Sequence, residues 1–160
     1  MTATRLLRRS VAFRPALVCV LAALLVAACG YSGSHAARVR QWASANSYVS
    51  NEAQVVSDAD HAELAAAKGT AKQLQTVCGG LSSDIGTLYD TLPTPDAPAT
   101  SALNAASTSL YDGAELCAAT ASTRTARVRR ALADIRRGLA ALGRANERLA
   151  SFGVRARGPA

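Results

Sequence analysis

Apolar residues recur every three or four positions through most of this chain, which is the spacing of one face of an α-helix. The clearest run lies in residues 70–92, where the intervals of three and four follow one another without a miss. Three further runs lie in residues 36–67, 98–121 and 124–151, and no segment alternates with the period of a β-strand for long. The pattern therefore predicts four helices over these four ranges.

Proline, glycine and capping residues mark where these helices end. The segment Pro93–Pro98 is the strongest break, because proline cannot continue a helix and restricts the residue before it. Asp96 can cap the helix that follows. A moderate break lies at Gly69, which suits the end of one helix, and Thr70, which can begin a capping box. The weakest break is Ser122–Thr123, which could serve as an N-cap.

Together the three breaks predict an all-α fold, an antiparallel four-helix bundle with short loops. If the two weaker breaks fail, the chain forms one long two-helix hairpin that folds back at the proline turn. This alternative stays open. The bundle domain is expected to occupy residues 35–152, and residues 153–160 are expected to form a frayed tail.

The first residues of the chain have a different character. Residues 1–14 carry four arginines and no acid, and an apolar run from Ala16 to Ala28 follows. Thirteen helical residues span only about 20 Å, too little for the ~30 Å hydrocarbon core of a membrane. A basic region, a short apolar run and small residues before a cysteine follow the order of a cleaved secretory signal. We therefore expect residues 1–28 to be a signal peptide.

The end of that run, Val26-Ala27-Ala28-Cys29, resembles the lipobox of bacterial lipoproteins. The resemblance implies that Cys29 is lipidated and becomes the first residue of the mature protein. Residues 29–34 would then be a lipidated linker on a domain that faces outside the cytoplasm. Two or more acyl chains give stable anchoring to the cell membrane. An ordinary cleaved signal that ends by chance at a cysteine is the alternative.

The remaining cysteines predict one disulfide. Once Cys19 leaves with the signal peptide and Cys29 takes lipid, Cys78 and Cys117 remain. An even number of remaining cysteines in an exported chain indicates a disulfide. Both lie about 20 to 28 Å along their helices from the proline turn, on the apolar faces. The close helix approach that the bond needs is expected from small neighbours: Gly79, Gly80, Gly113 and Ala114.

This hairpin also resembles a group of known proteins. A cysteine, then Leu-Pro-Thr-Pro-Asp at residues 92–96, then a second cysteine is similar to exported alanine-rich helical proteins of actinobacteria. The resemblance covers residues 70–121 and implies no activity.

Charge is unevenly distributed along the chain, whose formal net charge is +7. From Trp42 to Thr123 only Lys68 and Lys72 are basic, against nine acids, whereas residues 124–157 hold ten arginines. We favour a basic helix that packs beside acidic ones. The functional interpretation is a basic face that rests on anionic lipid headgroups or wall polymer. Nucleic acid is not expected as a partner outside the membrane.

Candidate chemistry is sparse. Asp58 and His61 are weak candidates for metal ligands, because they share one helix face at i, i+3. Di-iron bundles need two such pairs and two further carboxylates. His35 is expected to be exposed near the linker. The sequence contains no nucleophile elbow, phosphate-binding loop or paired-histidine motif, so we expect no catalytic residue, cofactor or metal.

These observations predict a non-catalytic lipoprotein that acts as an interaction or structural module of the cell envelope. Its expected partners are the membrane, through the lipid anchor, and another envelope protein or anionic lipid. A small-molecule or metal-binding helical bundle is the alternative function.

Overall fold

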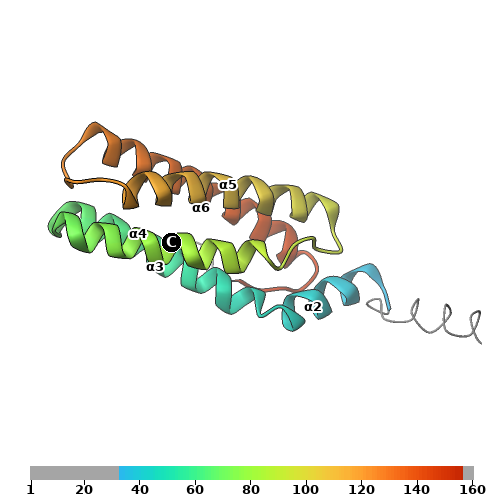
Figure 1. The fold of residues 1–160 in the computed structure, drawn as a ribbon. Coiled ribbons are helices and arrows are strands. Elements are labelled where there is room, and N and C mark those ends of the chain that lie inside the picture. The colour runs from blue at the N-terminus through green and yellow to red at the C-terminus, as the bar shows by residue number, and fades with distance from the viewer. Residues whose placement is uncertain (1–32, 157–160) are drawn as a thin grey trace, which may run out of the picture. The chain divides into compact units, whose positions relative to one another are not determined.

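The structure is a computed structural model that describes residues 33–156. These residues form five α-helices and no β-strand (Figure 1). The helices are α2 (His35–Ala45), α3 (Tyr48–Lys68), α4 (Ala71–Tyr89), α5 (Ala97–Ala118) and α6 (Ala126–Ala150). The predicted all-α class is confirmed for this part of the chain. The predicted signal peptide, Cys29 and residues 157–160 lie outside the described residues.

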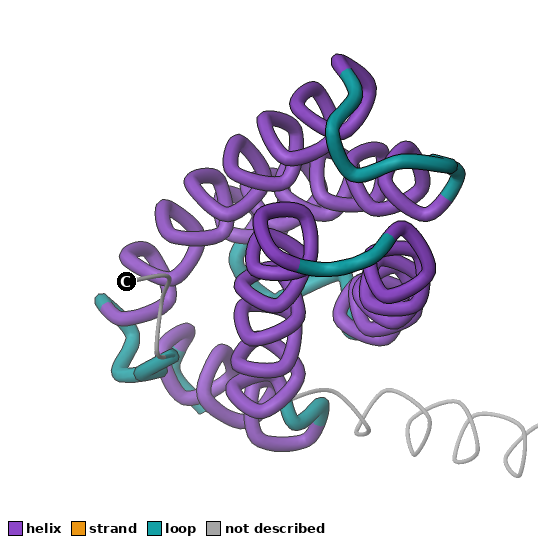
Figure 2. The backbone as a smooth tube through the Cα atoms, turned by 90° about the vertical axis from the view of Figure 1, so that its left-hand side faces the viewer, coloured by secondary structure: helices purple, strands orange, loops and turns teal. Residues whose placement is uncertain are grey.

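The long helices pack in the order in which they follow along the chain. α3 packs against α4, α4 against α5 and α5 against α6, while α3 also touches α6. Figure 2 shows that short loops join the helices. The chain turns at residues 69–70 and again at 119–125, so the alternative of one long two-helix hairpin is wrong. No helix within residues 33–156 combines the length and apolarity needed to cross a membrane.

Helix caps account for most of these boundaries. At the start of α4, the Gln73 amide donates to Thr70 Oγ1 at 3.2 Å and the Thr70 amide donates to Gln73 Oε1 at 2.8 Å, which completes the predicted capping box. Asp96 caps α5 as predicted. The weakest break is displaced, because α6 begins after Thr125, whose hydroxyl accepts from the Val128 amide at 3.2 Å.

The predicted helix over residues 36–67 is wrong, because the chain breaks at Asn46 and Ser47. Ser47 adopts a left-handed conformation with φ of 51°, and the Asn46 side chain donates to the Trp42 carbonyl at 2.8 Å. Asn and Ser bond readily to nearby backbone groups in this way, in competition with helix continuation. The break lets Trp42 and Tyr48 enter the same core, with ring centroids 5.1 Å apart.

A continuous helix could not achieve this burial. Residues six positions apart point about 120° away from each other on a helix of 3.6 residues per turn. The predicted apolar face of the first helix therefore changes beyond the break. Val49 belongs to the apolar positions that predicted a helix over residues 36–67, but it is 39 % exposed, and Tyr48 is buried in its place.

The disulfide between Cys78 and Cys117 is confirmed. The two Cα atoms are 5.9 Å apart, and both residues are fully buried between α4 and α5. The predicted role of the neighbouring glycines is wrong. A Cβ built on Gly79 meets nothing within 4 Å, and one built on Gly80 meets only an Asp58 oxygen at 3.9 Å.

The glycines that permit close approach lie between α5 and α6. A Cβ on Gly138 would stand 2.5 Å from Leu110 Cγ and 2.8 Å from the Leu110 nitrogen. A Cβ on Gly113 would stand 2.7 Å from Ile135 Cγ1 and 2.9 Å from the Ile135 nitrogen. The two helices therefore meet backbone to backbone at two points, in one antiparallel register.

Of the tail predicted to fray, residues 153–160, the structure describes residues 153–156, and Val154 within them packs against the domain. Val154 is only 5 % exposed, and its amide donates to the Leu149 carbonyl at 3.2 Å. Gly153, whose φ is 87°, adopts the left-handed conformation that ends this turn. Arg40 of α2 donates to the Phe152 carbonyl at 2.9 Å, so α2 holds this segment in place.

We predict opposite effects for two glycine-to-alanine substitutions. Gly138→Ala forces a methyl group into the Leu110 backbone and should destabilise the domain by about 1–3 kcal/mol. Gly79→Ala is the matched control, because its Cβ meets nothing within 4 Å. It should stabilise the domain by about 0.5–1 kcal/mol through helix propensity. Urea unfolding of both variants measures the difference, and equal stability of the two would contradict the close contact.

Loss of the disulfide should lower stability strongly. The bond joins residues 39 positions apart, and a loop of this length contributes about 4 kcal/mol on the chain-entropy model. Cys78→Ser should therefore lower the melting temperature by more than about 10 °C. Cys117→Ser should lower it equally, and the double variant no further. Identical melting curves for the wild type with and without reductant would refute the stabilising role.

Candidate functional site

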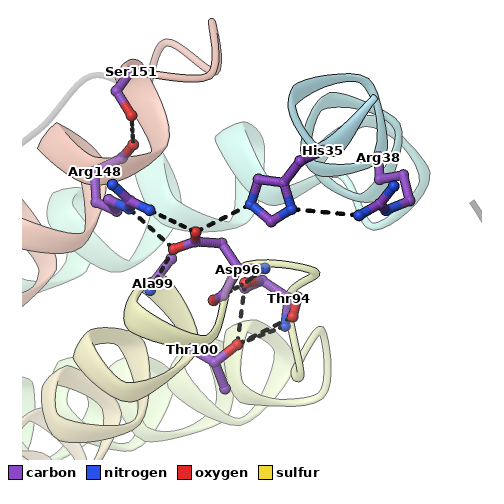
Figure 3. A network of polar contacts seen from close by, with 8 residues as sticks. All are labelled: His35, Arg38, Thr94, Asp96, Ala99, Thr100, Arg148 and Ser151. Carbon is purple, nitrogen blue, oxygen red and sulfur yellow. Dashed lines mark hydrogen bonds and ion pairs between the residues drawn. The ribbon is translucent and has the colours of Figure 1, made fainter. Parts of the chain in front are cut away.

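Three segments that are distant in the sequence meet at the carboxylate of Asp96 (Figure 3). Asp96 is only 3 % exposed, and its Oδ1 accepts from the Ala99 amide at 2.9 Å. The guanidinium of Arg148 donates to both oxygens, at 3.1 Å from Nε and 2.9 Å from Nη2. His35 Nε2 lies 3.2 Å from Oδ2. One carboxylate thus joins the start of α5, the end of α6 and the start of α2.

The loop before α5 presents this carboxylate in a defined position. Thr94 Oγ1 donates to the Asp96 carbonyl at 2.7 Å and accepts from the Asp96 amide at 3.0 Å. The Thr94 amide in turn donates to Thr100 Oγ1 at 2.9 Å. Because both the amide and the carbonyl of Asp96 are hydrogen-bonded to Thr94, the backbone that carries the carboxylate is fixed in position.

The bonds to Asp96 lower its pKa. The two N–H groups of Arg148 are the largest cause, and the Ala99 amide and His35 act in the same direction. Burial opposes them, and the pKa of the carboxyl falls to about 2. Asp96 therefore carries its negative charge across the physiological pH range, and it acts as a fixed anion that holds two basic side chains.

His35 is exposed on one side, as predicted, and engaged on the other. Its side chain is 43 % exposed, while its ring makes an edge contact with Phe152 at 5.1 Å between centroids. The Arg148 guanidinium lies 4.8 Å from the centre of the same Phe152 ring. Asp96, through polar contacts, and Phe152, through its ring, thus hold the same two side chains, His35 and Arg148.

A cavity of about 610 Å³ lies between α2, the start of α3 and the segment after α6. Two arginines from distant parts of the chain line it, Arg40 on α2 and Arg155 after α6. Three serines at or beside the α2–α3 break also line it: Ser44, Ser47 and Ser50. The first turn of α3 adds the positive end of a helix dipole. Guanidinium and hydroxyl groups together suit a phosphate or carboxylate ligand.

A second polar group lies buried between α3 and α6. Tyr48 Oη donates to Asn146 Oδ1 at 2.6 Å, and Asn146 Nδ2 donates to Glu52 Oε1 at 2.9 Å. Burial, and then the nearby charge of Glu52, raise the pKa of the Tyr48 hydroxyl. Glu52 is fully buried, and its Oε2 has no hydrogen-bond partner among residues 33–156. The group joins two helices through the core.

The weak metal candidates do not gather a ligand set in the described part of the chain. His61 Nδ1 lies 3.9 Å from Asp58 Oδ1, and no group of three or more His, Cys, Asp or Glu side chains there could hold a metal ion. Asp58 lies instead beside Asp84 of α4. Burial, and then a hydrogen bond and the charge of Asp84, raise the pKa of the Asp58 carboxyl.

The arginines of α6 divide into two groups. Three are paired with acids: Arg136 with Glu63 at 2.7 Å, Arg137 with Asp134 at 2.8 Å and Arg148 with Asp96 at 2.9 Å. The pairs of Arg136 and Arg148 join α6 to acids of other segments, as expected for a basic helix packed beside acidic ones, whereas the Arg137 pair lies within α6. Others, including Arg129, Arg130 and Arg144, are exposed on the outer side of α6.

Sequence reasoning identified Asp96 as a cap but missed both of its basic partners. Arg148 and His35 lie 52 and 61 positions away from it, and no local pattern marks such distant partners. The Arg40–Arg155 cavity was missed for a related reason, since it depends on the unexpected break at Ser47 and on the packed segment after α6.

Comparisons with known proteins add no assignment. The chain matches no protein-family model, no curated protein and no solved structure.

Asp96 should make stability depend on pH at acid values. Because its folded-state pKa is depressed to about 2 from 3.8, its contribution is present above about pH 4 and is lost as the pH falls towards 2. Asp96→Asn keeps the cap but removes the charge. The variant should be less stable by roughly 1–2 kcal/mol at pH 6, and this deficit should shrink by pH 2.

Asp134→Asn is the matched control, because Asp134 pairs with the exposed Arg137 three positions away. A pair between neighbouring positions of one helix contributes only about 0.3–0.5 kcal/mol. Urea unfolding at pH 6 and pH 2 measures both variants. A deficit for Asp96→Asn that is equal at the two pH values would refute the charge interaction.

Proposed function

We propose that this protein is a membrane-anchored, non-catalytic lipoprotein that faces outside the cytoplasm, with Cys29 as its lipid attachment site. In this proposal α3 to α6 form an antiparallel four-helix bundle that serves as an interaction module of the cell envelope. The partner that we favour is anionic lipid at the surface of the same membrane.

The observation that carries the proposal is the arginine-lined cavity, because Arg40 follows the predicted anchor Cys29 by only 11 positions in the sequence. Four residues of chain lead from Cys29 to Gly33, a reach of at most about 14 Å. Helix α2 follows directly and is 11 residues long, or about 16 Å. With α2 lying along the membrane surface, Arg40 and Arg155 come within reach of the headgroups.

The chemistry of the cavity supports an anionic headgroup. Two guanidinium groups can each donate two N–H bonds to phosphate oxygens. The apolar residues of the cavity, which include Ala43, Val49 and Val154, offer a surface for the first carbons of the lipid. Anionic lipids attract arginine with about 1 kcal/mol per residue near the surface.

The interior polar groups support a structural role for the described domain. Asp96 joins α2, α5 and α6, and the Tyr48–Asn146–Glu52 group joins α3 to α6. Each of these groups fixes one helix against another. A domain stiffened in this way suits a module that presents a surface.

The anchor can be tested with two cysteine variants. In bacteria supplied with a labelled fatty acid, the wild-type protein should carry the label and its mature N-terminus should be Cys29. Cys29→Ser should lose the label completely, because no thiol remains to be acylated. Cys19→Ser is the matched control, since this cysteine leaves with the signal peptide and the label should stay.

Mass spectrometry of the N-terminal peptide provides the readout. Acyl label retained by Cys29→Ser, or an unmodified Cys29 within an intact precursor of the wild type, would overturn the anchor and with it the proposed function.

A further inference from the structure

A groove between α4 and α5 has a different chemistry from the cavity described above. Its volume is about 320 Å³, and no residue lines both sites. Residues from two turns of each helix form its walls: Ile85, Gly86 and Tyr89 from α4, and Ser107, Tyr111 and Asp112 from α5. Pockets of about this size are the smallest that commonly hold small ligands.

Two aromatic side chains are exposed at this groove. Tyr89 is 53 % exposed and Tyr111 is 47 % exposed, one from each helix. Aromatic residues make up only 4 % of the chain, yet two exposed tyrosines lie at this one groove. Tyrosine rings present a face of negative electrostatic potential, which attracts cations.

A buried hydroxyl without a partner lines the same groove. Ser107 is only 4 % exposed, and its Oγ makes no hydrogen bond to any described residue. Buried polar atoms are nearly always paired, since an unpaired one loses its bonds to water without replacement. Because this oxygen has almost no accessible surface, a ligand in the groove meets the other lining residues first.

The charge around the groove favours a cation. Asp112 is its one charged lining residue, and no lysine, arginine or histidine contributes to it. Glu115, one turn further along α5, is also exposed. An anion would meet repulsion here with no donor to compensate it.

We propose that this groove binds a primary ammonium group carried on a short alkyl chain. The N–H groups donate to the Asp112 carboxylate, and the positive charge lies against the rings of Tyr89 and Tyr111. The alkyl chain packs against Ile85. Such a group occurs in soluble amines and in the headgroups of aminophospholipids.

The test is a titration of the full chain in a non-ionic maltoside detergent, followed by NMR of the tyrosine ring protons. The probe is n-butylammonium, and n-butanol is a neutral probe of nearly the same size. Butylammonium should shift the Tyr89 and Tyr111 signals with a dissociation constant of about 1 mM. Butanol should bind at least about tenfold more weakly, because it lacks the charge.

Three substitutions locate the site. Tyr111→Ala should weaken butylammonium binding about fivefold through the lost cation–ring contact. Asp112→Asn should weaken it by about tenfold, as expected for a lost charged hydrogen bond. Asp90→Asn is the matched control, because Asp90 is exposed beside Tyr89 but does not line the groove, and it should leave binding unchanged.

Vesicles distinguish the source of the ammonium group. A shift of the tyrosine signals with phosphatidylethanolamine vesicles, and none with phosphatidylglycerol vesicles, assigns the groove to a lipid headgroup. A shift with soluble butylammonium alone assigns it to a free amine. Equal affinity for butanol and butylammonium, or no shift of either tyrosine with soluble or vesicle probes, would overturn the proposal. Neither result depends on lipidation of Cys29, so the two proposals fail separately.

Discussion

Close contact between α5 and α6 is the constraint on which the rest of the domain depends. Gly113 and Gly138 let the two backbones touch at two points, which leaves no freedom to slide one helix along the other. In that antiparallel register the start of α5 lies beside the end of α6. Asp96 therefore meets Arg148, and a buried charge finds its partner.

The same register organises the end of the domain that carries α2. Asp96 Oδ2 accepts from Arg148 and also lies within hydrogen-bond distance of His35, and Phe152 packs against both basic side chains. The segment after α6 is thereby held against α2, where Arg40 bonds its backbone. The arginine-lined cavity forms between these pieces. A site that we propose for anionic headgroups is thus a consequence of helix packing elsewhere in the domain.

The cavity and the groove carry opposite charges and share no residue. The cavity near α2 presents guanidinium groups and a helix N-terminus, whereas the groove between α4 and α5 presents a carboxylate and two tyrosine rings. The disulfide lies between the same two helices as the groove and fixes their spacing. A rigid groove loses less entropy when it binds a small ligand, so the bond would favour the binding that we propose here as well as stability.

Local chemistry was readable in the amino-acid order: the capping box at Thr70, the cap at Asp96, the apolar face that carries Cys78, and the lone cysteine pair. Each depends on residues within about one helical turn, or on the number of cysteines in the chain. The break at Ser47 was missed because its advantage, the joint burial of Trp42 and Tyr48, comes from the core and not from neighbouring residues. The partners of Asp96, the contacts of Gly138 and the packing of Val154 required the tertiary structure, because they join positions whose proximity arises only when the helices have packed.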